Sequence, residues 1–112
     1  MEIYLDRITR EIAINIKDVL GEKLQKIILY GSYSRGDYDD ESDIDIMVLA
    51  DINSYELGQY RKDINKIASR VGLDYDIMLS ISLKNVDEFY NRRDILPYYQ
   101  NIIREGTEIY VN

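Results

Sequence analysis

The sequence of 112 residues contains no cysteine, no histidine and no tryptophan, and it has only one proline. Without cysteine, disulfides and zinc–thiolate sites are excluded. Without histidine, Ser-His-Asp chemistry, histidine general bases and histidine-ligated metals are excluded as well. Catalysis would therefore depend on carboxylates, hydroxyls and cations, and any metal ion would need oxygen ligands.

The chain also lacks basic residues relative to acidic ones, with 14 against 21 and a formal net charge of −7. This balance argues against non-specific binding of duplex DNA, which requires a basic surface. Six acidic residues lie within one segment that has no Lys or Arg: Asp37, Asp39, Asp40, Glu41, Asp43 and Asp45. The other 15 acidic residues nearly balance the 14 basic ones, so this segment accounts for most of the net charge.

Long apolar runs are absent too. No segment approaches the roughly 18 consecutive apolar residues of a membrane span, and the N-terminus lacks the basic-then-apolar pattern of a signal peptide. Because roughly 100–200 residues per domain is usual, we expect residues 1–112 to form a single domain. We expect this domain to be cytoplasmic, with no membrane contact.

The hydrophobic pattern predicts a small domain of the α/β (α+β) class. Apolar residues at spacings of three or four predict two helices, 2–20 and 54–71, with glycines at 21 and 72 as stops. Asn53 and Glu56 form a plausible capping pair for the second helix. Short apolar runs predict three strands, 26–30, 43–50 and 73–81.

The tail is expected to add one or two short helices over residues 83–105, interrupted near Pro97, and a small edge strand over 107–111. A polar loop, 31–42, separates the first two predicted strands. This order of elements predicts one small mixed β-sheet covered by helices.

Two aspartates, Asp43 and Asp45, open the second predicted strand. Because strand side chains alternate between faces, both carboxylates should project from one face, and Ile44 and Ile46 from the other. Adjacent carboxylates repel each other unless a cation bridges them. Magnesium suits this arrangement, since it binds through one or two carboxylates together with substrate phosphates and water. For an Asp-x-Asp pair taken alone, a solvated strand end is an equally good interpretation.

A second pair of aspartates, Asp74 and Asp76, falls on the third predicted strand, again on a common face. If the second and third strands are neighbours, one of these residues would complete a cluster of three carboxylates.

Gly31 and Ser32 lie where the first predicted strand ends. Glycine lets the backbone approach a phosphate closely, and the serine offers a hydroxyl and an amide N–H. Arg35 and Gly36 follow, giving a cation and a second flexible point. A Gly-Ser pair by itself is more often an ordinary tight turn.

The two features occur together, as Gly31-Ser32, ten residues and then Asp43-x-Asp45, between two predicted strands. The segment LYGSYSRGDYDDESDIDIMVL resembles the nucleotidyltransferase signature of the DNA polymerase β superfamily. Within that superfamily it is most similar to the minimal nucleotidyltransferases (MNT), often found as antitoxins beside HEPN-domain toxins. The resemblance is sharp over residues 27–50 and weaker through the tail LPYYQNIIREGTEIYV, so it covers most of the chain. It implies a polymerase-β-like fold.

The resemblance also implies roles for individual residues. Gly31 and Ser32 would hold the β and γ phosphates of a nucleoside triphosphate, and Asp43 and Asp45 would bind Mg²⁺. The family's third carboxylate lies on the following strand, where Asp76 is the first choice. Asp74 is the alternative, because the register of that strand is not fixed by the sequence.

Arg35 has two interpretations: it contacts a phosphate, or it ties down its own loop by pairing with Asp37 or Glu41. All four acids of the loop itself are interpreted as solvated groups and not as ligands: Asp37, Asp39, Asp40 and Glu41. Three tyrosines of the tail are candidates for the rim of a partner surface: Tyr98, Tyr99 and Tyr110.

The resemblance implies a Mg²⁺-dependent nucleotidyltransferase that moves AMP from ATP, or another nucleoside monophosphate from its triphosphate, to a hydroxyl of a HEPN-type partner protein. One or two magnesium ions would take part. A small-molecule acceptor of the aminoglycoside type and a non-catalytic antitoxin that only binds its partner are the alternatives. The sequence leaves the base preference and homo-oligomerisation open.

Overall fold

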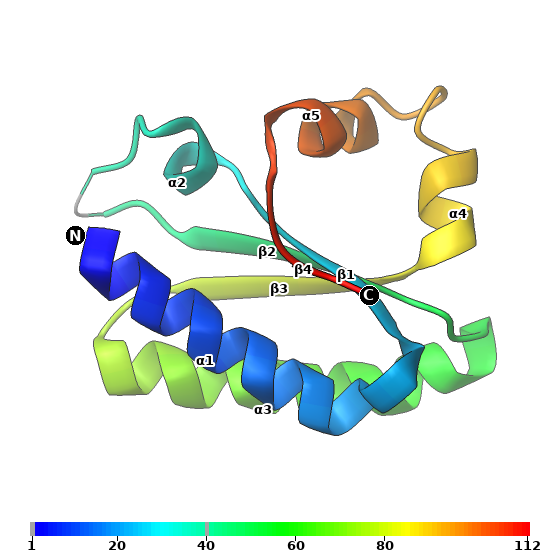
Figure 1. Cartoon of the computed structure of the whole chain (residues 1–112), viewed down its shortest axis with the longest axis horizontal. Coiled ribbons are helices and arrows are strands. Elements are labelled where there is room, and N and C mark those ends of the chain that lie inside the picture. The colour runs from blue at the N-terminus through cyan, green and yellow to red at the C-terminus, as the bar shows by residue number, and fades with distance from the viewer. Residues whose placement is uncertain (1, 40) are drawn as a thin grey trace.

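The computed structural model describes residues 2–39 and 41–112, and Figure 1 shows its β-sheet between two layers of helices. Asp40, one of the acids interpreted as solvated, lies outside the described residues. The elements in chain order are α1 (Glu2–Leu20), a 3₁₀ turn (Gly21–Lys23), β1 (Leu24–Tyr30), α2 (Ser32–Arg35), β2 (Ile44–Ala50), α3 (Ser54–Tyr75), β3 (Leu79–Asn85), α4 (Val86–Asn91), α5 (Pro97–Glu105) and β4 (Thr107–Val111).

The four strands form one mixed sheet in the order β3-β2-β1-β4. β1 pairs antiparallel with both β2 and β4, whereas β2 and β3 are parallel. The parallel pair is connected by α3, as expected, since parallel neighbours need a long crossover. The predicted mixed sheet covered by helices is therefore confirmed.

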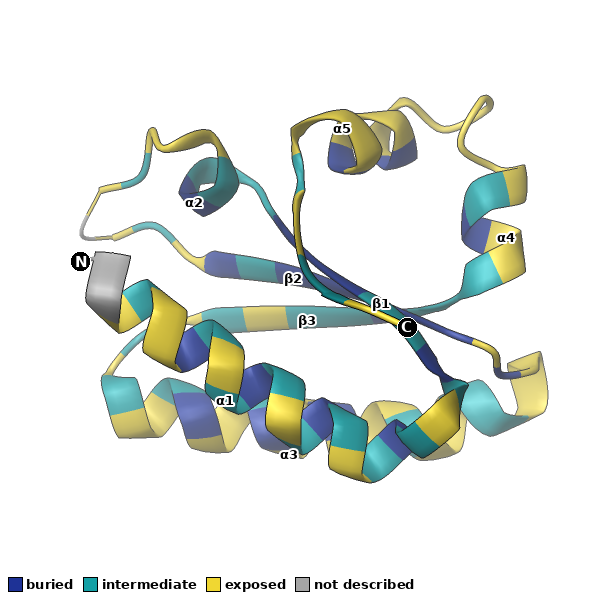
Figure 2. Ribbon diagram, viewed as in Figure 1, coloured by how far each residue is buried: buried dark blue, intermediate teal, exposed yellow. Residues whose placement is uncertain are grey.

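The two faces of the sheet are covered by different helices, α1 and α3 on one side and α4 and α5 on the other (Figure 1). Strand side chains alternate between these faces. Ile27 and Leu29 of β1 pack in the core with α1 and α3, while Ile28 packs with Phe89 of α4 and Ile102 of α5. In Figure 2 buried and exposed residues alternate along α1 and α3, and the buried ones pack in the core with the sheet.

Most predicted elements are confirmed. α1 ends at Leu20 as predicted, and the first two strands begin within two residues of the expected positions. Asn53 and Glu56 form a complete capping box at the start of α3. The tail contains the two expected short helices, α4 and α5, but β3 continues to Asn85, so the expectation of helix is wrong for residues 83–85. Pro97 opens α5 at a position where its missing N–H is not needed.

The prediction of a strand over 73–81 is wrong for its first six residues. α3 does not stop at Gly72 but continues to Tyr75, because Tyr75 packs edge-on against Tyr4 and donates a hydrogen bond to Glu11, both of α1. Asp76 then ends the helix in the left-handed region, with φ 54°. The third strand begins only at Leu79.

None of the helices formed by the described residues is long and apolar enough to cross a membrane.

Candidate active site

The Gly-Ser turn and the Asp-x-Asp pair meet where β1 ends and β2 begins. In the antiparallel register Tyr30 lies opposite Asp45, so Gly31, the next residue, comes beside the same carboxylate. A Cβ added to Gly31 would lie only 2.5 Å from Oδ2 of Asp45, and the φ of Gly31 is +78°. Both the close approach and the backbone conformation require glycine.

α2 reverses the chain after this turn. The N–H groups of Ser34 and Arg35 each donate to the carbonyl of Gly31 at 3.1 Å, and Gly36 ends the helix in the left-handed region. Ser32 is half-buried at the first position of this single turn. The Gly-Ser pair is therefore a strand-to-helix turn set against a carboxylate.

The predicted alternation of side chains is confirmed at Asp45, whereas Asp43 lies just before β2, which begins at Ile44. Ile44 and Ile46 are fully buried in the core with α1 and α3, whereas Asp45 shares the opposite face with Met47, which packs toward α4 and α5. Asp43 is exposed and Asp45 half-buried.

Electrostatics at this pair favour a cation. The pKa of Asp45 is raised above its usual value, first by partial burial and second by the charge of Asp43, while Arg35 acts in the opposite direction. Both carboxylates offer the oxygen donors that Mg²⁺ prefers, and a bound cation would relieve the repulsion between them. The donor set therefore fits magnesium.

The third carboxylate is not where the sequence places it. Asp74 lies in the last turn of α3 and Asp76 at its C-cap, so the shared strand face inferred for them is wrong. The residue of β3 that pairs with Asp45 is Ser80. Within residues 2–39 and 41–112, no three acidic side chains lie close enough together to hold one metal ion.

Asp76 nevertheless lines the same open groove as Asp43. This groove has a volume of about 840 Å³ and runs between the C-terminal half of α3 and β3. Asn65, Ser69 and Ser80 add polar groups to its wall. The assignment of Asp76 as third carboxylate stays a prediction, supported now by the groove and no longer by the strand.

Tyr30 lies opposite Asp45 in the strand register, although the sequence pattern indicated no role for it beyond the first strand. Its hydroxyl lies 2.7 Å from that of Tyr98 in α5. Burial first, and then the hydrogen bond with Tyr98, raise the pKa of Tyr30 well above its usual value, and the charge of Asp45 adds to this. The only signal in the sequence was its place just before Gly31.

Among the tail tyrosines proposed for a partner surface, Tyr98 is exposed, but Tyr99 is buried against Phe89. The expected rim role of Tyr99 is therefore wrong. Tyr110 is half-buried beneath the ammonium group of Lys17.

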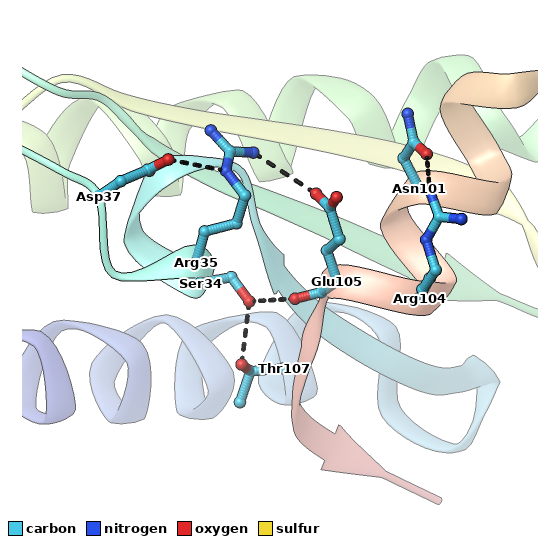
Figure 3. Close-up of polar contacts among 7 residues, drawn as sticks. All are labelled: Ser34, Arg35, Asp37, Asn101, Arg104, Glu105 and Thr107. Atoms are coloured by element: carbon cyan, nitrogen blue, oxygen red, sulfur yellow. Dashed lines mark hydrogen bonds and ion pairs between the residues drawn. The ribbon is translucent and has the colours of Figure 1, made fainter.

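The guanidinium group of Arg35 pairs with two acidic residues, one in its own loop and one in α5 (Figure 3). Its Nε donates to Asp37 at 3.1 Å, which confirms one of the predicted partners. Its second partner is Glu105 of α5, whose carboxylate lies 3.6 Å from Nη1 of Arg35. The sequence had suggested Glu41 instead, because a partner 70 positions away leaves no local pattern.

Comparison with known proteins adds an independent finding. A family model described as "Nucleotidyltransferase domain" matches residues 13–108 of the chain. A protein of Methanocaldococcus jannaschii named as a putative protein adenylyltransferase is 44% identical over 80 residues, which are 71% of this chain and 77% of that protein.

Two solved structures share the fold. One, described as a toxin-antitoxin with AMP-PNP, gives a TM-score of 0.57 at 23% identity and covers 90% of this chain and 72% of its own. The other, from Shewanella oneidensis, holds a tri-AMPylated HEPN toxin in complex with MNT antitoxin. It gives a TM-score of 0.56 at 20% identity, with 96% of this chain and 72% of that chain covered.

Proposed function

The chain belongs to the nucleotidyltransferase domain family, and we propose that it transfers AMP from ATP to a hydroxyl of a partner protein. The observation that carries this proposal is the contact of Gly31 with the carboxylate of Asp45. This contact brings the Gly31–Ser32 turn, which is suited to phosphates, next to the aspartate pair, which is suited to magnesium. The phosphates and the metal ion of a Mg–ATP complex can therefore bind at one place.

Each residue has a proposed task in this reaction. Gly31 and Ser32 bind the β and γ phosphates, and Asp43 and Asp45 hold the divalent cation. Mg²⁺ bound there would neutralise charge on the triphosphate and on the departing pyrophosphate. The acceptor oxygen attacks the α-phosphorus as the bond to pyrophosphate breaks. We assign Asp76 as the carboxylate that receives the acceptor proton, because it lines the groove beside Asp43.

The acceptor is proposed to be a HEPN-type protein in the cytoplasm, with this chain as its antitoxin. Support comes from the name of the M. jannaschii relative and from the S. oneidensis complex, in which the HEPN toxin is AMPylated. The groove beside Asp43 is open, so a protein segment can reach the carboxylates from solvent.

The test is transfer of labelled AMP from ATP to a candidate HEPN-type partner protein, in the presence of Mg²⁺. Wild-type protein should label the partner, and the double variant Asp43→Asn/Asp45→Asn should not. Asp51→Asn is the matched control, since it removes an exposed aspartate just beyond the other end of β2. Neutralisation of the toxin without label, equally by wild type and double variant, would contradict the proposal and identify a non-catalytic antitoxin.

The same assay separates the candidates for the third carboxylate. Asp76→Asn should reduce labelling by about a hundredfold, the size expected for the loss of a general base. Asp74→Asn, two residues away in the same exposed helix end, should label at the wild-type rate. The reverse result would move the assignment to Asp74.

A further inference from the structure

The short helix α2 is tied to a segment that comes about 70 residues later in the chain. Oγ of Ser34 donates to the backbone carbonyl of Glu105 at 2.6 Å and lies 3.0 Å from Oγ1 of Thr107 (Figure 3). Arg35, the next residue, reaches the carboxylate of Glu105. Three polar contacts therefore join α2 to the junction between α5 and β4.

This junction is itself fixed to the sheet. Thr107 pairs with Leu29 of β1, which comes two residues before Gly31 in the chain. Gly106 passes so close to the carbonyl of Ile102 and the side chain of Ile28 that an added Cβ would clash with both. The N–H of Gly106 also donates to Ile102 at 2.8 Å. The junction can therefore act as a firm support.

α2 needs such a support. A helix of four residues has no stability of its own, because nucleating a helical turn costs more than its few hydrogen bonds return. On one side it is held by Tyr33, which is buried and stacks on Tyr38 with ring centroids 4.4 Å apart. On the other side, the contacts from Ser34 and Arg35 to the α5–β4 junction set its orientation.

We propose that Glu105 and Thr107 are positioning residues, which act through Ser34 and Arg35 to hold the Gly31–Ser32 turn in place for the nucleotide phosphates. This inference rests on the function proposed above for that turn. The C-terminal segment then contributes to ATP binding, although none of its residues belongs to the Gly-Ser or Asp-x-Asp pattern. Loss of the support lets α2 shift, so nucleotide binding weakens while the groups that carry out the chemistry remain.

The experiment measures KM for ATP and kcat separately, with saturating partner protein and Mg²⁺. Ser34→Ala and Glu105→Gln should each raise KM about fivefold, the effect of one lost hydrogen bond or weak ion pair, and leave kcat within about twofold. Ser34→Thr keeps a hydroxyl and should retain the wild-type KM. Thr107→Val, which keeps the shape of the side chain, should show a smaller rise than Ser34→Ala.

The matched control is Arg104→Gln. Arg104 donates to Asn101 at 2.7 Å on the same helix, and its side chain lies away from Ser34 and Arg35 (Figure 3). This variant should keep the wild-type KM. If Ser34→Ala and Glu105→Gln behave like Arg104→Gln while wild type labels its partner, the inference is wrong and the proposed function stands. A fall in kcat and melting temperature with unchanged KM would also overturn it, since that pattern indicates general destabilisation.

Calorimetric binding of a non-hydrolysable ATP analogue with Mg²⁺ keeps the two proposals apart. If wild type binds the analogue but labels no protein, the proposed function fails. The inference is then decided by whether Ser34→Ala weakens this binding about fivefold. A wild type that binds no nucleotide overturns both.

Discussion

The two faces of the sheet differ in how they are covered. α1 and α3, of 19 and 22 residues, lie along one face, while α4 and α5, of six and nine residues, cover the other. On the first face the residues of β2 are fully buried, as at Ile44 and Ile46, but on the second Asp45 stays half-exposed. The long helices stabilise the domain from one face, and the short helices leave Asp45 partly exposed on the other. The groove lined by Asp43 and Asp76 lies between α3 and β3.

The largest expected effect on stability belongs to the α1/α3 face. Ile12 of α1 has no exposed surface, and Ile12→Ala should lower the free energy of unfolding by about 2–5 kcal/mol, because it removes buried methyl groups and leaves a cavity. Ile14, on the same helix, is 58% exposed, and Ile14→Ala should change stability by less than about 0.5 kcal/mol. Urea denaturation measures both.

AMP transfer per folded molecule should be the same for Ile12→Ala as for wild type. A loss of AMP transfer in Ile12→Ala larger than its unfolded fraction explains would contradict the separation between the two faces.

The second prediction concerns the site and uses two glycines that both have positive φ. Gly31→Ala places a Cβ against the carboxylate of Asp45, whereas a Cβ on Gly36 would meet nothing within 4 Å. Gly36→Ala should lose about 1–2 kcal/mol of stability from the left-handed backbone. Gly31→Ala should lose about 1–3 kcal/mol, because φ 78° with ψ −157° is a conformation essentially restricted to glycine. Only Gly31→Ala should also reduce AMP transfer, by about tenfold or more, because Asp45 must move.

Equal transfer rates for these two variants, measured on samples of equal folded fraction, would show that the contact between Gly31 and Asp45 does not matter for the reaction.

The smallest predicted effect is a pH dependence on the α1/α3 side. The hydrogen bond from Lys23, and then that from the N–H of Asn53, lower the pKa of Glu56. A lowered carboxyl pKa stabilises the fold above the ordinary value near 4.3, and the contribution disappears as the pH falls through the lowered value. Glu56→Gln should therefore melt about 2 °C below wild type at pH 7, since the pair is partly exposed.

The melting difference between wild type and Glu56→Gln should narrow as the pH falls from 7 to 3, and thermal scans at the two pH values measure it. A difference that persisted in full at pH 3 would point to the capping hydrogen bond and not to the charge of Glu56.

The sequence predicted what local patterns determine. The apolar spacing of α1, the capping box of Asn53 and Glu56, and the alternation of Asp45 with Ile44 and Ile46 all depend on residues a few positions apart. The family was indicated by the resemblance of residues 27–50 to the nucleotidyltransferase signature, which is also a local stretch of sequence.

Contacts between distant residues decided the rest. α3 continues past Gly72 because Tyr75 donates a hydrogen bond to Glu11 of α1, which lies 64 positions earlier in the chain. The alternating pattern around Asp74 and Asp76 fits a strand equally well, and only that tertiary contact selects the helix. The pairing of Arg35 with Glu105 is of the same kind, and it has no trace in the local sequence.

The most direct measurement is calorimetric titration of the protein with ATP, with and without Mg²⁺. We expect binding only when Mg²⁺ is present, because Asp43 and Asp45 repel a bare triphosphate. This binding should be lost in Asp43→Asn/Asp45→Asn but not in Asp51→Asn. Equal affinity for ATP with and without Mg²⁺ would contradict the claim that these two aspartates and the Gly31–Ser32 turn form one metal–nucleotide site.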